Sequence, residues 1–290
     1  MPNSNSAKKY GFKKFKFSTN WRSKLALITP FIILTLLLVI IPLILIFIKS
    51  FTPVSGATIN DNWNFVDMFI FNKILISLVI AILTTVICVA LSYPFCYILA
   101  RSTNQIYKAI IIFIATAPIW TSFLVKLVGL KTFFDVINGF QNSTFGHLWT
   151  VVGLVYLYIP FMLAPLYTTM INMPPNLVNA SQDLGRNNFQ TFFAVVIPYT
   201  MTALISGITL VFLPSLVTVA VPAFLNGSPD GSLIGDIIVE EGNLATTSEI
   251  AMARASTLSL ILLLVLVAGY GLFLGGKYGV KAIKQRGSTK

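Results

Sequence analysis

A run of 24 residues without a charged side chain, residues 25–48, constrains the fold more than any other feature of the sequence. A helix needs roughly 20 apolar residues to cross the hydrocarbon core of a bilayer, so this run can span a membrane. Hydrophobic residues make up 56% of the chain, charged residues only 10%, and the mean hydropathy is +0.84. We therefore expect an all-α membrane protein rather than a soluble domain, a disordered chain or a disulfide scaffold.

Further apolar runs of this kind predict a polytopic protein with six membrane-spanning helices. The third run is the shortest, and flanking lysines are expected to extend it to the interface. The predicted spans cover residues 25–48, 74–100, 109–125, 148–170, 200–220 and 255–276. The expected organisation is therefore a basic tail (residues 1–24), a membrane domain (residues 25–276) and a second basic tail (residues 277–290). The membrane domain contains a polar loop at residues 171–198.

The distribution of charges predicts the orientation of the chain. Six spans place both termini on one side, and a cytoplasmic placement gives that side 15 of the 20 Lys and Arg residues. The opposite side then holds eight of the nine acidic residues, all except Asp183. The positive-inside rule favours this arrangement, with both termini cytoplasmic. The net charge of +11 is thus explained by topology and by contact with membrane lipid, and we expect no nucleic-acid partner.

Five acidic residues lie in one segment between the fifth and sixth predicted spans. They are Asp230, Asp236, Glu240, Glu241 and Glu249. The segment is expected to be either a solvated loop or a surface that receives a cationic substrate or its extracellular binding protein.

The segment between the fourth and fifth spans carries the signals of a short helix. Pro175 suits the first turn of a helix, and Gly185 suits the left-handed position that closes one. Leu177, Ala180 and Leu184 recur at helical spacing on one face. A helix of about ten residues is marginal in water on its own, so its apolar face needs a receiver. No Lys or Arg precedes Arg186 in this helix, which favours a protein partner over lipid headgroups.

A second helix is expected directly after the turn. Asn187 or Asn188 can cap it, and it continues towards Pro198 and the fifth span. The two helices would form a rigid element joined to two spans. Such an element could transmit a movement of a partner protein to the membrane helices. The alternative is an interfacial loop that merely lies on the membrane.

Residues 179–185, which read N-A-S-Q-D-L-G, resemble the EAA loop of the inner-membrane permeases of ABC transporters, the binding-protein-dependent transport family. The D-L-G ending is similar to the form found in the branch that serves polyamines. Three more segments resemble spermidine/putrescine permeases, in particular the subunit usually encoded first of the two. They are residues 118–126 (P-I-W-T-S-F-L-V-K), 158–167 (Y-I-P-F-M-L-A-P-L-Y) and 212–216 (F-L-P-S-L).

This resemblance implies a membrane subunit of an ATP-driven importer in a bacterial inner membrane. Its partners would be a dimer of an ATP-binding subunit, a second homologous permease and an extracellular substrate-binding protein. The implied ATPase-coupling residues are Leu177, Asn179, Ala180, Asp183, Leu184 and Gly185. Asn179 stands where the family has a glutamate, which leaves the contact with the ATPase to shape, Asp183 and the turn at Gly185.

The translocation path is expected among prolines that have polar or aromatic neighbours within the spans. Proline frees a backbone carbonyl, and a kink beside an aromatic ring suits a cation-tolerant path. With the resemblance, the expected path residues are Trp120, Thr121, Ser122, Tyr158, Pro160, Pro214 and Ser215. Aromatic and acidic positions found in the polyamine branch are replaced here, for example by residues 128–130 (V-G-L). An inorganic ion or thiamine therefore stays an alternative substrate.

The sequence carries no signature of chemistry of its own. It lacks a G-x-x-x-x-G-K-[ST] phosphate loop, so we expect ATP and Mg²⁺ to be bound by the partner ATPase, with no cofactor in this chain. His147 is the only histidine, which leaves neither a zinc-binding pair nor a catalytic triad. We expect no catalytic residue, no metal and no enzyme. A passive channel and a membrane-embedded enzyme are the alternatives from other classes.

Overall fold

The computed structural model describes residues 21–54, 58–138, 146–225 and 232–287, and every regular element in these ranges is a helix. Five helices are long and apolar enough to cross a membrane, and a bent pair of helices makes a sixth candidate. The prediction of an all-α membrane protein is confirmed. The helices are α1 Trp21–Thr35, η1 Leu36–Ile40, α2 Ile41–Phe51, α3 Ile59–Trp63, α4 Met68–Arg101, α5 Gln105–Thr116, η2 Ala117–Trp120, α6 Phe123–Asn138, α7 Gly146–Ile171, α8 Pro175–Asp183, α9 Asn188–Thr191, η3 Phe192–Val196, α10 Ile197–Leu216, α11 Ala220–Leu225, α12 Ile234–Leu244 and α13 Glu249–Gly287.

The chain divides into a unit of residues 1–48 and a unit of residues 49–290. The first unit holds α1, η1 and most of α2, which together give the candidate span Ile28–Phe51. Pro42 lies at the second position of α2 and has no N–H to donate. The turn before it, η1, is a π-helix, in which the Ile41 N–H bonds to the Leu36 carbonyl.

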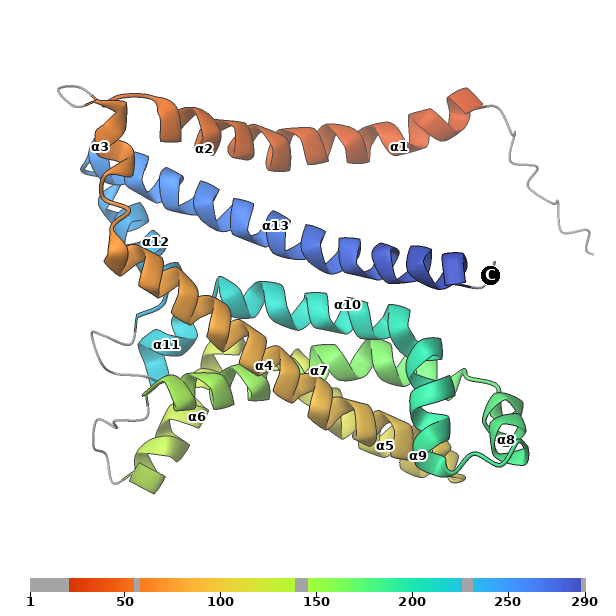
Figure 1. Cartoon of the computed structure of the whole chain (residues 1–290). Helices are drawn as coiled ribbons and strands as arrows, with labels where there is room; N and C mark the ends of the chain where they lie inside the picture. Colours follow the sequence, from red (N-terminus) through yellow and green to blue (C-terminus); the bar gives the residue numbers. More distant parts are fainter. Residues whose placement is uncertain (1–20, 55–57, 139–145, 226–231, 288–290) are drawn as a thin grey trace, which may run out of the picture. The chain divides into compact units, whose positions relative to one another are not determined.

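The second unit is built around three long helices, α4, α7 and α10, that pack against one another along their lengths (Figure 1). Their contact buries an apolar core that includes Cys88, Met162, Leu166 and Val211. Gly207 of α10 permits a close approach to α7, because a Cβ added there would lie 2.5 Å from the sulfur of Met162. A small residue is thus needed at this crossing, as is usual where membrane helices pack closely.

The remaining helices of this unit lie at the two ends of the three-helix core. Figure 1 shows α8 and α9 at the end where α4 finishes, and α11 and α12 at the opposite end. There α13 is held by a buried hydrogen bond of 3.2 Å between the hydroxyls of Ser50 and Thr257. The Asn62 side chain donates to the Thr52 carbonyl at 3.0 Å and joins α3 to the same corner.

The third predicted span is broken. Instead of one helix over residues 109–125, the candidate span consists of Gln105–Trp120 and Phe123–Ile137, bent by 100°. Pro118 lies just before the break, and Thr121 and Ser122 form the corner between the two helices. A run of apolar residues predicts that a segment enters the membrane, but not that it stays straight.

Other boundaries also differ from those expected. The fifth span begins at Asn188 rather than near residue 200, because α9, η3 and α10 follow one another without a gap. The backbone of α13 stays helical to Gly287, through most of the expected tail of residues 277–290. The acidic segment before it contains a helix, α12. Of the N-terminal tail, residues 1–20 lie outside the described residues.

Candidate coupling and translocation site

Helix α8 has the ends that its sequence predicts. Pro175 occupies its first position, after Pro174 as the N-cap. At the other end Gly185 has φ +84°, the left-handed conformation that glycine adopts without a Cβ penalty. The Gly185 N–H bonds to the Gln182 carbonyl at 2.8 Å, and the Arg186 N–H to the Ser181 carbonyl at 3.3 Å. This pair of hydrogen bonds is a Schellman motif, which closes the helix and reverses the chain sharply.

The second helix starts directly after this turn. The Asn187 side chain accepts a hydrogen bond from the Gln190 N–H at 2.8 Å, and the Gln190 side chain accepts one from the Asn187 N–H at 3.2 Å. This reciprocal pair is a capping box, so the prediction of an asparagine cap is confirmed. From this cap the helix runs through η3 into α10, and it joins the turn rigidly to the fifth span.

Side chains lock the two short helices together. The hydroxyls of Ser181 and Thr191 lie 3.1 Å apart in a buried hydrogen bond, and the Gln182 amide donates to the Asn188 side chain at 2.6 Å. Val178 is buried beside them. We call α8, the turn and α9 the coupling element, after the role that the sequence predicts for it. Two side-chain hydrogen bonds and a Schellman turn fix the angle between its helices.

One face of α8 remains open. Ser181 and Val178 face inward, whereas all of the predicted coupling residues are exposed: Leu177, Asn179, Ala180, Asp183, Leu184 and Gly185. Leu184 is 83% exposed and Leu177 42%, so two leucines of a short polar helix contact little of this chain. Such a face is suited to a protein partner.

The coupling element is also tied to the second span. Phe192 in η3 packs edge-on against both Tyr93 and Tyr97 of α4, with ring centroids 5.4 and 5.3 Å apart. The Tyr93 hydroxyl forms a buried hydrogen bond with Thr200 of α10. A displacement of α8 would therefore reach α4 and α10 through packed rings and hydrogen bonds.

Three of the predicted path residues lie at the break in the third span. Trp120 is 81% exposed, and Thr121 and Ser122 are exposed beside it. The Pro118 carbonyl accepts the Thr121 N–H at 3.4 Å, and it also accepts hydrogen bonds from the Thr121 hydroxyl at 2.9 Å and the Lys126 ammonium at 2.8 Å. These bonds satisfy the carbonyl, so the corner is a defined structure with an indole projecting from it.

The other predicted path residues do not share this surface. Pro160 is buried in α7, and Ser215 is buried in α10, where its hydroxyl donates to the Val211 carbonyl at 2.7 Å. Tyr158 is half-buried and its hydroxyl interacts with Thr218, whereas Pro214 is exposed. Ser215 and Pro160 are therefore placed to shape the helices, while Trp120, Thr121, Ser122 and Pro214 are accessible.

Asp236 is a polar site that the sequence did not single out from the other acidic residues. Its Oδ2 accepts a hydrogen bond from the Leu233 N–H at 2.8 Å, while its Oδ1 is buried without a hydrogen-bond partner among the described residues. Burial raises the pKa of this carboxyl to about 6, although the Leu233 N–H and the positive charge of Lys73 oppose the rise. Glu240 and Glu249, by contrast, are exposed.

The start of α12 is held against α4 and the end of α10. The Ile234 N–H donates to the Ser77 hydroxyl at 3.0 Å, and this hydroxyl donates to the Lys73 carbonyl at 2.8 Å. A Cβ added to Gly235 would lie 2.5 Å from the Thr218 carbonyl oxygen. Gly235, directly before Asp236, was the available signal that this segment packs closely rather than forming an open loop.

Comparisons with known proteins agree with this architecture. Residues 92–274 match the family described as "Binding-protein-dependent transport system inner membrane component". The chain is 40% identical over 258 residues to the "Spermidine/putrescine transport system permease protein PotB homolog" of Mycoplasma genitalium, covering 86% of this chain and 90% of the relative. It is 29% identical to the permease protein PotB of Haemophilus influenzae, over 80% of this chain and 87% of the relative.

A solved structure has the same fold. It is the crystal structure of a bacterial ABC transporter involved in the import of the acidic polysaccharide alginate, with a TM-score of 0.61 and 12% identity over 89% of this chain and 98% of that chain. The relatives named above are permease proteins, which are transport components rather than enzymes, as the sequence predicts. By its family match and its helical architecture, the chain belongs to the inner-membrane components of binding-protein-dependent transport systems, the permeases of ABC transporters.

Proposed function

We propose that this permease serves an importer of polyamines such as spermidine and putrescine. The observation that carries the proposal is the 40% identity, over 90% of its length, to a relative named for spermidine and putrescine transport. The motif around Trp120 supports it, because an exposed indole attracts alkylammonium groups through a cation–π interaction. Trp120, Thr121 and Ser122 would contact the substrate, and Tyr158, Pro160, Pro214 and Ser215 would shape the path.

The importer would contain two copies of an ATPase, a second permease and an extracellular binding protein. A single chain supplies half of a pathway, so a second permease is needed to close it. ATP and Mg²⁺ would be held by the ATPase, since this sequence has no phosphate loop. The exposed face of α8, with Leu177, Ala180 and Leu184, is the surface that would dock on the ATPase.

The expected cycle uses the rigidity of the coupling element. Closure of the ATPase dimer displaces α8. Because the Ser181 and Thr191 hydroxyls are hydrogen-bonded, α9 moves together with α8 and the turn between them does not flex. Phe192 then passes this displacement to Tyr93 and Tyr97 of α4. The bundle alternates between outward and inward openings, with α8 and both termini on the cytoplasmic side, as the positive-inside rule favours.

ATP-dependent uptake into vesicles that carry the reconstituted complex tests the substrate. Radiolabelled spermidine or putrescine should accumulate only when ATP is supplied, and excess unlabelled polyamine should compete. ATP-dependent accumulation of labelled thiamine or of an inorganic ion, with none of labelled polyamine, would contradict the polyamine assignment and leave the permease assignment intact. Flux without ATP would indicate a passive channel.

A further inference from the structure

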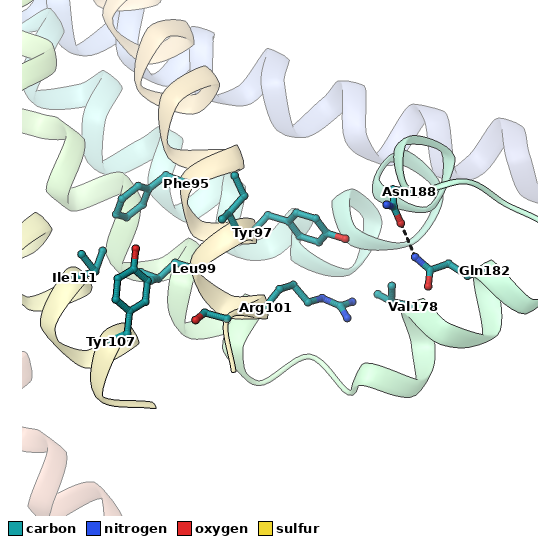
Figure 2. Close-up of a pocket in the computed structure, with 11 residues that line it drawn as sticks. Phe95, Tyr97, Leu99, Arg101, Tyr107, Ile111, Val178, Gln182 and Asn188 are labelled. Carbon is teal, nitrogen blue, oxygen red and sulfur yellow. Dashed lines mark hydrogen bonds between the residues drawn. The ribbon is translucent and has the colours of Figure 1, made fainter. Parts of the chain in front are cut away.

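A groove lies beside the coupling element, where α4 ends and α5 begins. It encloses about 680 Å³ between these helices and the two short helices α8 and α9 (Figure 2). Ile98 and Ile111 form apolar parts of its wall, and Tyr97, Arg101, Ser102 and Tyr107 supply polar groups. The groove is therefore amphipathic, with hydroxyl and guanidinium groups beside hydrocarbon.

Among the described residues that line the groove, Arg101 is the only charged one. Figure 2 shows its guanidinium extending from the end of α4 towards Val178 of α8. It lies 5.7 Å from the centroid of the Tyr97 ring, an arrangement that keeps it in the groove. The nearby Lys108 ammonium donates to the Ala100 carbonyl at 3.2 Å and neutralises part of the negative end of the α4 dipole. The groove consequently favours an anion.

The depth of the groove in the membrane follows from the length of α4. Its 34 residues rise about 51 Å at 1.5 Å per residue, whereas a bilayer with its headgroups is about 40–45 Å thick. Arg101, the last residue of α4, thus lies at or near headgroup level. Ile98, one turn earlier, is 71% exposed, and Ile114 of α5 is 62% exposed. Exposed apolar side chains in the spans, of which Ile98 lines the groove itself, suit contact with acyl chains.

We propose that this groove binds the headgroup of an anionic phospholipid. The lipid phosphate would accept hydrogen bonds from Arg101, whose planar guanidinium matches phosphate oxygens, and from the hydroxyls of Ser102 and Tyr107. One acyl chain would run along Ile98 and Ile111. A protein occupant would have to insert an acidic side chain next to surface that faces acyl chains, which favours a lipid.

This site has a consequence for coupling, because α8 forms one wall of it. Val178 and Gln182 line the groove, and Gln182 is also held by Asn188. A bound headgroup would contact both α8 and the end of α4, and would fix the position of the coupling element relative to the second span. Anionic lipid is therefore expected to raise the coupling of ATP hydrolysis to transport.

Lipid titration of the complete complex tests the proposal without reference to the transported substrate. The complex, purified with its partner subunits, is placed in phosphatidylcholine nanodiscs, and retained phosphatidylglycerol is counted by native mass spectrometry as its fraction is raised. Arg101→Gln should raise the apparent dissociation constant for phosphatidylglycerol about tenfold, a loss that corresponds to one charge-assisted hydrogen-bonded contact. Arg101→Lys should raise this dissociation constant by less, because lysine keeps the positive charge.

The matched control is Lys131→Gln, which removes an exposed cation from α6 at a distance from the groove. Equal phosphatidylglycerol retention in the Arg101 and Lys131 variants would overturn the proposal. So would retention of the lipid only after the ATPase has been stripped from the wild-type complex, since the groove would then belong to the protein partner. Displacement of the lipid by soluble glycerol 3-phosphate would show a free-phosphate site and overturn it as well.

Discussion

The hydroxyls of Ser181 and Thr191 form a buried hydrogen bond of 3.1 Å that joins the two helices of the coupling element. Both side chains are almost completely removed from solvent, at 6% and 0% exposure. A buried hydroxyl without a partner carries a desolvation penalty, so breaking this hydrogen bond costs free energy and the pair makes the coupling element rigid.

Ser181→Ala should destabilise the protein by about 1–3 kcal/mol, because it leaves the Thr191 hydroxyl buried and unpaired. The double variant Ser181→Ala with Thr191→Val should recover much of that loss, since it removes both polar groups. Thermal unfolding of the purified chain measures both effects. Additive losses in a double-mutant cycle would show that the two hydroxyls do not interact.

Substitution of Gly185 should uncouple transport through its backbone conformation alone. A Cβ there meets no atom within 4 Å, but φ is +84°, so an L-residue costs roughly 1–2 kcal/mol and a β-branched one more. Gly185→Val should lower ATP-driven uptake while membrane insertion is preserved, and Gly185→Asn should be milder because asparagine tolerates this conformation.

Gly242→Val provides the control for this turn. Gly242 also has open space around its Cβ, but its φ is not in the left-handed region. Uptake by the Gly242 variant should exceed uptake by Gly185→Val. Full transport by Gly185→Val would count against the coupling role of the turn.

Trp120→Ala should reduce polyamine uptake without lowering thermal stability, because the indole is 81% exposed and contributes little to the core. A lost cation–π contact of about 0.5–2 kcal/mol corresponds to a rise in KM of roughly 2- to 30-fold. Phe113→Ala removes another exposed aromatic ring, 66% exposed in α5, and serves as the control. Equal kinetics in the two variants would remove Trp120 from the path.

Asp236 should make stability depend on pH between about 4 and 6. Its pKa in the folded chain is about 6, raised from 3.8 chiefly by burial, with the nearby charge of Lys73 opposing the rise. Because the folded pKa is the higher one, the stabilising contribution is fully present below about pH 4 and is lost as pH rises through 6.

Asp236→Asn keeps an acceptor for the Leu233 N–H but cannot ionise. Its thermal midpoint should therefore fall less than that of the wild type as pH rises from 4 to 7. Glu240 is exposed on the same helix, so the thermal midpoint of Glu240→Gln should depend on pH as that of the wild type does. Parallel curves for all three proteins would show that Asp236 is not the group responsible.

Features that depend on local chemistry can be predicted from the sequence. Charge-free runs long enough to cross a bilayer predicted the membrane helices, since a span must satisfy its backbone internally and present apolar side chains to lipid. Pro175, Gly185 and Asn187 predicted the ends of the two coupling helices, because each acts through its own backbone or side-chain geometry within a few residues. The resemblance in the surrounding motifs predicted the family.

How these elements face one another becomes visible only in the folded chain. The two halves of the third span are bent by 100° after Trp120, and α6 then packs on α7 and α11, which composition does not encode. Asp236 lies at the buried start of α12, where Gly235 approaches Thr218 and the Ile234 N–H bonds to Ser77, whereas Glu240 is exposed further along the helix. Burial of an acid and the direction of a helix after a break are set by neighbours remote in sequence, and their positions exist only once the chain has folded.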